Sequence, residues 1–493
     1  MLTTLAIIAA ILALLAYMFV RYMSATHNTF KKMGIDNPAP NPIIGNFGNV
    51  FKYGIFEVQK VFYNQYIDKK VYGWYDSRRP TMIVKDLDMV KDIFVKNFNC
   101  FVDRHSLFEV DPPFSDNLLN LKGEHWKHVR NIVTPTFSSS RLKKMAHHIE
   151  RNTKIMLENL QALQESGTEV EARDFLSAFT LDVIASTGFG LEINTLKNPN
   201  NPFATEAKKV INPNPLLFSL ILLIPSLTKL FSRLGLSILP QKSLQYFVKV
   251  VEAAIEERKR DGLEGKVNDF LDLVMNAEKE TGEPHKELTR SELYGQALIF
   301  IFAGYDTVST VLSFTLFFIA MHPDCCKRVQ EEIDEKCGQT SPNYDNVQSL
   351  AYLDMCINES IRLAPPAFLI NRVCVKDTEV QGVKFPKDMV VAVPVYAIHT
   401  DPEIWPEPDK FDPKRFTPEN KESRHPYAHL PFGQGPRNCI GMRLALLEIK
   451  IALATIFQKF TPTRCSKSVY PIQLSKMGVR ANDGLWIKFA ARK

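Results

Sequence analysis

The pattern of apolar and polar positions divides the chain into an uninterrupted apolar start and a long region of mostly helical spacing. Leu2–Val20 carries no charged residue, and it is close to the roughly 20 residues that a helix needs to cross a bilayer. Apolar residues recur at helical spacing in Phe175–Ile184 and Leu244–Arg260, and residues 289–321 form one long, mostly apolar helical stretch. These patterns predict a membrane-anchoring helix followed by a mainly α-helical body.

Short runs of β-branched and aromatic residues add a few strands to this helical pattern. Val71–Tyr75 and Thr81–Val84 predict a small sheet near the amino end. Three more strand-like runs follow at Val373–Val375, Val390–Val393 and Leu485–Lys488. The sequence therefore predicts a fold that is mainly α with a minor β portion.

The apolar start is interpreted as a retained anchor over residues 1–21 rather than as a cleaved signal peptide. A signal peptide has a shorter apolar region of about 7–15 residues and usually a basic start. Basic residues follow the apolar run at Arg21, Lys31 and Lys32, and none precedes it. The positive-inside rule then places everything after the anchor on the cytosolic side of the membrane.

The segment after the anchor predicts a connector between the membrane and a globular body. Pro38, Pro40 and Pro42 cannot continue a helix and favour an extended chain. Residues 22–45 are therefore expected to form a basic and proline-rich hinge. Residues 46–493 are expected to form one domain, because no convincing linker interrupts them.

A second strongly apolar stretch, within residues 212–240, leaves two interpretations open. Its apolar centre, residues 216–224, is too short to span a bilayer, and prolines bracket it. It is either a buried core helix or a second membrane contact.

Composition and charge exclude several classes of protein. The formal net charge of +6 is mild for 493 residues and includes no dense basic tract. It suits a membrane face or an acidic protein partner, and nucleic acid is not expected as a partner. The eight cysteines form no C-x-x-C pair and no spacing typical of a disulfide framework. A zinc site is therefore not expected.

One cysteine, Cys439, lies in a glycine-punctuated loop directly before an apolar helical pattern at 442–449. Gly433 and Gly435 allow a tight turn that aims backbone N–H groups at one sulfur. The N-terminal end of the following helix adds partial positive charge near the same atom. Both effects lower a thiol pKa and favour the thiolate, which is the form that binds metals. The alternative is a buried structural cysteine in a turn.

The string from Phe432 to Gly441 fits the pattern F-x-x-G-x-R-x-C-x-G, and on this motif the chain resembles the cytochrome P450 family of haem-thiolate enzymes. The resemblance covers nearly the whole chain and is nearest to the vertebrate family-three group of microsomal members, through Phe302–Tyr305 and Gly435–Arg443. It implies the cytochrome P450 fold and haem b held by a Cys439–iron bond. It also implies an endoplasmic reticulum protein with a single-pass anchor and a cytosolic catalytic domain over 46–493.

The long helical stretch carries an acid and a hydroxyl, Asp306 and Thr307, among apolar residues. An unpaired carboxylate is costly in such a place. The local alternative is that Thr307 bonds back to the helix while Asp306 is paired elsewhere. The small residues Ala303 and Gly304 are expected to leave room for a flat macrocycle. The resemblance implies that Asp306 and Thr307 are catalytic and relay protons for oxygen activation.

Glu359 and Arg362 lie three residues apart on one predicted helix face. Taken alone they could be an exposed helical ion pair. The resemblance implies that Arg415 joins them from the Pro413–Phe416 segment. The three then hold the chain around the cysteine loop, in a structural rather than catalytic role.

Several cationic side chains are expected to pair with the two haem propionates. Trp126 and Arg130 lie four residues apart and so share a helical face. Guanidinium groups suit carboxylates because they pair in a bidentate fork. For any one of these cations a surface salt bridge is the alternative. With the resemblance, the predicted cofactor-binding residues are Arg104, Trp126, Arg130, Arg372, Phe432, Arg437 and Cys439.

The chain has neither a P-loop nor a G-x-G-x-x-G motif, so no flavin or nicotinamide site is expected within it. Electrons are then expected from another protein. The resemblance implies NADPH as the source, acting through NADPH-cytochrome P450 reductase, with cytochrome b5 as a second candidate donor. Lys127, Lys421 and Arg424 are candidates for docking an acidic reductase.

The resulting hypothesis is a haem-thiolate monooxygenase acting on a small lipophilic substrate of the steroid, fatty acid or xenobiotic class. A reductase-independent lipid endoperoxide isomerase similar to thromboxane synthase is the alternative, suggested by Pro365–Phe368. Those isomerases lack the threonine at the position of Thr307, which favours the monooxygenase. A third hypothesis is a haem protein that binds a ligand without turnover. The role of His399 stays open.

Overall fold

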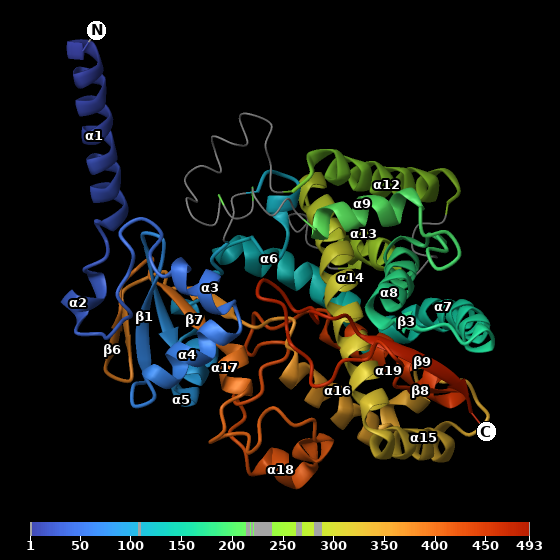
Figure 1. Cartoon of the computed structure of the whole chain (residues 1–493). Helices are drawn as coiled ribbons and strands as arrows, with labels where there is room; N and C mark the ends of the chain where they lie inside the picture. The colour runs from blue at the N-terminus through green and yellow to red at the C-terminus, as the bar shows by residue number, and fades with distance from the viewer. Residues whose placement is uncertain are drawn as a thin grey trace.

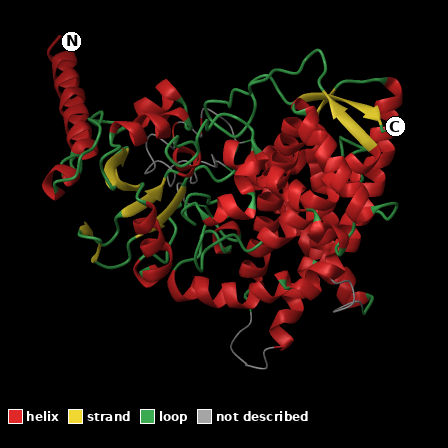
Figure 2. Cartoon of the chain, turned by 90° about the horizontal axis from the view of Figure 1, so that it is seen from below, coloured by secondary structure: helices red, strands yellow, loops and turns green. Residues whose placement is uncertain are grey.

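The computed structural model describes residues 2–106, 110–212, 217, 220, 239–262, 269–280 and 288–492. In Figure 1 one helix, α1, stands clear of a body in which a small sheet lies beside a larger helical part. Figure 2 shows the same separation after a quarter turn, with one group of strands near the amino-terminal helix and another near the carboxyl end. The prediction of a mainly α fold with a minor β portion is confirmed.

The larger sheet has four strands in the order β1-β2-β7-β4. Strand β2 pairs antiparallel with β1 and parallel with β7, and β7 pairs antiparallel with β4. The run predicted at Val373–Val375 is shifted, because β4 ends at Val373 and the next two N–H groups bond to the carbonyls of Met389 and Cys100. The strands are β1 (Val71–Asp76), β2 (Arg79–Val84), β3 (Val170–Glu171), β4 (Ile370–Val373), β5 (Thr378–Val380), β6 (Val383–Phe385), β7 (Val390–Val393), β8 (Phe460–Thr463) and β9 (Trp486–Ala491).

Helix α14 (Arg290–Met321) runs through the centre of the helical part (Figure 1). A capping box between Thr289 and Glu292 satisfies backbone N–H groups at its start. Nearly every side chain from Val308 to Met321 is buried, because α8, α16 and α19 pack around it. The other long helices are α6 (Gly123–Val133), α7 (Ser139–Ser166), α8 (Ala172–Phe189), α9 (Pro202–Ile211), α12 (Gln241–Arg260), α13 (Phe270–Glu280), α15 (Pro323–Cys337), α16 (Ala351–Leu363) and α19 (Met442–Lys459).

Short helices connect these elements. They are α2 (Thr29–Met33), α3 (Phe47–Tyr53), α4 (Glu57–Gln65), α5 (Leu87–Lys91), α17 (Val395–His399) and α18 (Pro418–Glu422). Single turns of other helix types occur at Asp92–Lys96, Phe98–Cys100, Phe114–Asp116, Thr134–Phe137, Asn346–Ser349 and Pro413–Phe416. The apolar stretch within residues 212–240, which is either a buried core helix or a second membrane contact, falls mostly on residues 213–216, 218–219 and 221–238, outside the described residues.

Helix α1 (Leu2–Ser24) leaves its large apolar side chains exposed along its length. The most apolar window of Leu2–Met33 has 0% of its residues buried, whereas 67% of the corresponding window of α14 is buried in the body. Exposed apolar surface is unfavourable in water by about 25 cal/mol per Å². Among the described helices, α1 is therefore the one whose surface suits a membrane anchor.

The segment that follows α1, within the predicted hinge of residues 22–45, packs against strand β1. Phe30 is fully buried. Its ring fills the space above Gly73, where an added Cβ would lie 2.3 Å from the ring atom Cδ2 of Phe30. The hydroxyl of Tyr75 accepts the N–H of Phe30 at 3.3 Å and donates to the carbonyl of His27 at 2.9 Å. Helix α1 is thus joined to the body through a packed segment.

Candidate active site

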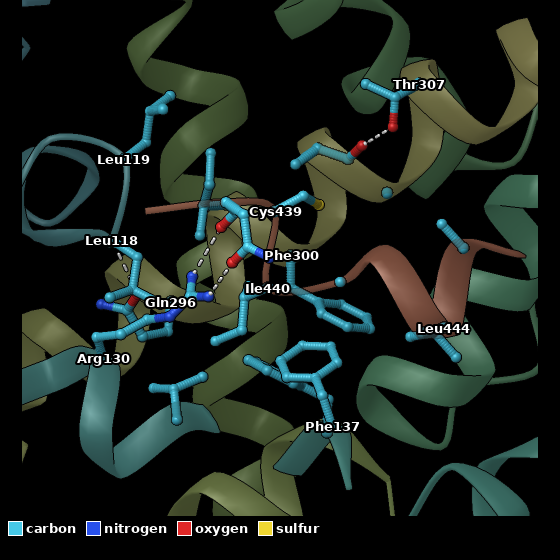
Figure 3. Close-up of a pocket in the computed structure, with 18 of the residues that line it drawn as sticks. Leu118, Leu119, Arg130, Phe137, Gln296, Phe300, Thr307, Cys439, Ile440 and Leu444 are labelled. Atoms are coloured by element: carbon cyan, nitrogen blue, oxygen red, sulfur yellow. Dashed lines mark hydrogen bonds between the residues drawn. The ribbon is translucent and has the colours of Figure 1, made fainter. Parts of the chain in front are cut away.

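Two adjoining cavities of about 200 and 700 Å³ lie beside α14. Both are lined by Cys439, Thr307 and Arg104, and by a majority of apolar side chains. Together they have the size and apolar character of pockets that hold a cofactor and a small molecule. Figure 3 shows Cys439 and Thr307 in the smaller cavity, with Phe137 and Phe300 on its wall.

The loop that carries Cys439 adopts the tight turn that its glycines allow. Gly433 and Gly435 have φ values of +69° and +78°, a region that other residues rarely adopt. A Cβ on Gly435 would lie 2.1 Å from the carbonyl oxygen of Phe94, so the loop packs directly on that backbone. The N–H of Cys439 donates to the carbonyl of Phe432 at 2.9 Å. Helix α19 begins three residues later, at Met442.

The surroundings of the Cys439 thiol act on its pKa in two directions. Its sulfur is open to the cavity, yet it lies deep beneath the protein surface, and this burial raises the pKa. Backbone N–H groups of Gly441 and Met442 and the charges of Arg104 and Arg130 act to lower it. Burial is the largest of these effects, so the pKa is raised overall and the lowering expected from the loop and the helix end does not prevail. A metal cation bound to the sulfur would favour the thiolate, since metal binding displaces the proton. All eight cysteines are free thiols.

Two arginines reach the backbone of the cysteine loop from elsewhere in the chain. Arg104 donates from Nη2 to the carbonyl of Arg437 at 2.7 Å. Arg130, on α6, donates to the carbonyl and the side-chain oxygen of Asn438 at 3.2 and 3.1 Å, as the dashed lines of Figure 3 mark. These bonds place both cations beside the cavity.

Arg437 and Arg372 add two guanidinium groups that are only partly paired. Both are buried. Arg437 lies over the ring of Trp126 at 4.4 Å and donates to the carbonyl of Leu121, while its Nε and Nη1 have no partner among the described residues. Arg372 donates from Nη1 to the carbonyl of Asn371 at 2.8 Å, and its Nε has no partner in the part of the chain that the structure describes.

The four arginines of this cluster (Arg104, Arg130, Arg372 and Arg437) disfavour one another's charge. Burial and the charges of Arg104 and Arg130 lower the pKa of Arg437 to about 9, even though Asp103 acts against the shift. Burial, with Arg104 and Arg437, lowers the pKa of Arg372. Within the part of the chain that the structure describes, none of the four forms an ion pair with a carboxylate. Such a cluster fits a ligand that brings two carboxylates, as haem does.

Helix α14 presents Ala303 and Thr307 to the cavity. Both residues are exposed although they lie in the core helix. The Thr307 hydroxyl donates to the carbonyl of Ala303. Gly304 also contacts a neighbouring helix, which the sequence did not predict. A Cβ at this position would lie 2.4 Å from Cδ1 of Ile184 on α8. Gly304 therefore permits the close packing of α14 on α8 as well as space in the cavity.

Asp306 does not line the cavity. Its carboxylate forms an ion pair with Arg173 of α8, with 2.8 Å between Oδ1 and Nη2, and 43% of its side chain is exposed. Arg173 also donates from Nη1 to the carbonyl of Val479 at 2.7 Å. The structure thus shows the local alternative given for Asp306 and Thr307: the threonine bonds back to its own helix, and the acid is paired with a residue of another helix.

The acid of the E-x-x-R element lies between two arginines, as expected. Glu359 accepts from Nε and Nη2 of Arg362 at 2.7 and 2.8 Å, and Nε of Arg415 lies 3.3 Å from its Oε1. The side chains of Glu359 and Arg362 are 0% exposed. Arg362 also donates to the carbonyl of His399 at 2.9 Å.

The predicted cofactor-binding residues that line the smaller cavity are Arg104, Trp126, Arg130, Arg437 and Cys439, and Phe432 lies on the wall of the larger one. Arg372 lines neither of the two cavities; it is buried close enough to Arg104 and Arg437 for their charges to lower its pKa. Sequence reasoning missed Arg173, because nothing in its local sequence indicates a partner 133 residues away. It also missed Glu448 of α19, which lines the smaller cavity. Glu448 is buried, its Oε1 has no partner among the described residues, and burial raises its pKa well above the usual range. Burial therefore favours the neutral carboxylic acid of Glu448 over its carboxylate.

A mainly helical fold, a cysteine open to an apolar cavity and a cluster of arginines without carboxylate partners define a haem-thiolate type of protein. The sequence pattern of the family Cytochrome P450 matches residues 36–488, and the chain belongs to this family. It is 40% identical to Cytochrome P450 3A16 of Mus musculus over 482 residues, covering 96% of this chain and 94% of the relative. It is 39% identical to Cytochrome P450 3A7 of Homo sapiens over 470 residues, covering 94% and 92%. The chain is accordingly a monooxygenase with haem as its cofactor.

Proposed function

We propose that this cytochrome P450 inserts one atom of dioxygen into a lipophilic substrate of the steroid, fatty acid or xenobiotic class, while the other atom leaves as water. The observation that carries the proposal is the mostly apolar cavity that holds both Cys439 and Thr307. When bound, haem supplies the iron centre at which dioxygen is activated. Cys439 would ligate the iron, and the arginine cluster would neutralise the propionates.

The remaining work falls to residues of the chain itself. The apolar walls exclude water and favour an apolar substrate. Thr307 offers a hydroxyl that can hold a proton in the cavity. The carboxylate of Asp306 is partly exposed and is held by Arg173 outside the cavity. Adjacent helical residues point about 100° apart, so Asp306 and Thr307 together carry protons around α14 from solvent to the cavity.

Electrons are proposed to come from NADPH through NADPH-cytochrome P450 reductase, with cytochrome b5 as a further donor. The protein is proposed to reside in the endoplasmic reticulum membrane, with α1 as a single-pass anchor and the catalytic domain in the cytosol. Lys127 and Lys421 are exposed and can meet an acidic partner. Arg424 is a poorer candidate, because it lies 3.8 Å from the ring centre of Trp405 and donates to the carbonyl of Arg415.

The test is oxidation by the full-length protein in reductase-containing vesicles under ¹⁸O₂. We expect lipophile-dependent NADPH consumption and products that carry one ¹⁸O atom. Turnover of a lipid endoperoxide without reductase or NADPH would instead support the isomerase, which neither the relatives nor the position of Thr307 favours. Tight lipophile binding with no product under either condition would support a ligand-binding protein.

Thr307→Ala should uncouple NADPH consumption from product formation. Without the hydroxyl the cavity loses the proton donor that α14 presents, and general acid catalysis of this kind contributes on the order of 10²-fold. We expect product per NADPH to fall by about that factor while NADPH is still consumed. Thr310→Ala is the matched control, since Thr310 also bonds back to a helix carbonyl at 2.7 Å but is buried away from the cavity. Equal coupling in the two variants would remove Thr307 from the mechanism.

Arg173→Gln should slow product formation without weakening substrate binding. The change releases Asp306 from its ion pair, so the carboxylate no longer has a fixed position on α14. We expect kcat to fall on the order of tenfold with KM for the lipophile unchanged, because positioning of a proton donor affects the chemical step. Arg151→Gln breaks the surface pair with Glu192 and serves as the control. A change in KM alone would contradict this role.

A further inference from the structure

The ring of His399 is bonded to the segment that leads into the cysteine loop. Nε2 of His399, at the end of α17, accepts the N–H of Leu430 at 2.9 Å. Both residues are 0% exposed. A ring that accepts at Nε2 is neutral and carries its proton on Nδ1. Burial and the charge of Arg362 lower the pKa of His399 to about 3, so the ring remains an acceptor at neutral pH.

The backbone of His399 is held at the same time by the buried ion pair. Its carbonyl accepts from Nη1 of Arg362 at 2.9 Å, and Nε of Arg362 bonds to Glu359 at 2.7 Å. The histidine therefore has a fixed position relative to α16. Through the bond to the Leu430 N–H, the ring of His399 fixes the chain at Leu430 relative to α16 as well.

Leu430 is connected to Cys439 by a short segment of chain and one backbone hydrogen bond. Pro431 has no N–H, so the N–H of Leu430 is the last backbone donor before Phe432. The carbonyl of Phe432 then accepts the N–H of Cys439 at 2.9 Å. On the other side the loop abuts the Phe94 carbonyl at Gly435. The loop is thus held between α17 and the backbone of Phe94.

We propose that His399 is a positioning residue for the haem ligand: by accepting the Leu430 N–H, its ring holds the cysteine loop so that the sulfur of Cys439 keeps a fixed place in the cavity. The proposal rests on the proposed ligation by Cys439. A ring that only filled space would serve equally well without an acceptor nitrogen. Substitution by phenylalanine, which keeps the ring, and by glutamine, which keeps an acceptor, therefore distinguishes a positioning role of His399 from a space-filling one.

The test compares His399→Phe and His399→Gln as full-length holoenzymes. The readout is the rate at which the thiolate-type Soret band of the reduced, carbon-monoxide-bound form disappears on mild warming. Phenylalanine keeps the ring but orphans a buried N–H, so we expect loss roughly tenfold faster than in the wild type. Glutamine offers a carbonyl oxygen and should restore the rate to within about threefold. His322→Phe, at the junction of α14 and α15, should leave the rate unchanged.

Two outcomes would overturn the proposal: a phenylalanine variant as stable as the wild type, or a glutamine variant no better than phenylalanine. Hydrogen–deuterium exchange of the wild-type holoenzyme gives a measurement that needs no variant. The Leu430 amide should exchange as slowly as amides within α14, and exchange at the rate of an open turn would contradict the bond to His399. Failure of Cys439 as ligand would appear separately, as the absence of the thiolate-type band in the wild type.

Discussion

Replacing Cys439 with alanine will abolish the thiolate-type Soret band of the reduced, carbon-monoxide-bound protein. Among the described residues that line the two cavities, Cys439 is the one that carries a thiol. No neighbouring sulfur can take its place, and the electron donation that favours O–O cleavage is lost with it. We expect monooxygenase activity to fall below detection. Absorption spectra and haem content of the purified variant measure both effects.

The Cys439→Ala variant keeps the arginine cluster, so haem content distinguishes a lost ligand from a lost pocket. Retained haem with an altered spectrum is the expected result. Cys465→Ala is the matched control, because that free thiol lies partly exposed and away from both cavities. A Cys439→Ala protein with the wild-type band would refute the assignment of the ligand.

Glu359→Gln will strongly destabilise the folded protein. It leaves Arg362 buried with an uncompensated charge, because both side chains are 0% exposed and are joined by bonds of 2.7 and 2.8 Å. Breaking a buried pair in this way costs about 3–5 kcal/mol. That is a large part of the roughly 5–15 kcal/mol that holds a domain folded. The midpoint of urea unfolding, followed by circular dichroism and by the Soret band together, measures the loss.

Two comparisons make the Glu359 result specific. Glu158→Gln removes an exposed partner of Lys197 and should shift the midpoint little, since exposed pairs contribute between about 0 and 1 kcal/mol. The double variant Glu359→Leu with Arg362→Leu should lose less than the sum of the two single variants, because the two fully buried charges are removed together and only Arg415, whose side chain is 10% exposed, loses its carboxylate. Additive losses would show that the two side chains act independently.

Turns, helices and side-chain pairs within one helix could be predicted from the sequence, because they depend on residues that are near one another in the chain. The cysteine loop could be recognised because Gly433, Gly435 and Cys439 lie within seven positions of one another, and turn geometry depends on adjacent residues. The pairing of Glu359 with Arg362 follows from a spacing of three on one helix. The long helix over 289–321 and the exposed α1 follow from apolar patterning.

Features that join distant parts of the chain could not be derived from spacing. The position of Asp306 depends on Arg173, which lies on another helix. Gly304 was expected to make room for a macrocycle, and its contact with Ile184 appears only when α14 packs on α8. The bond between His399 and Leu430 likewise depends on how α17 lies against the loop.

The order of amino acids already specifies the chemistry that this chain carries: a cysteine motif, an acid–threonine pair, a set of arginines and an apolar amino-terminal helix. Which of these groups face the cavity, and which are paired with one another, is set by folding. Thr307 faces the cavity while its neighbour Asp306 pairs with Arg173, and two of the arginines keep nitrogens without a partner among the described residues. The physical reason is that local geometry follows from adjacent residues, whereas desolvation and charge pairing depend on contacts between segments that are far apart in the chain.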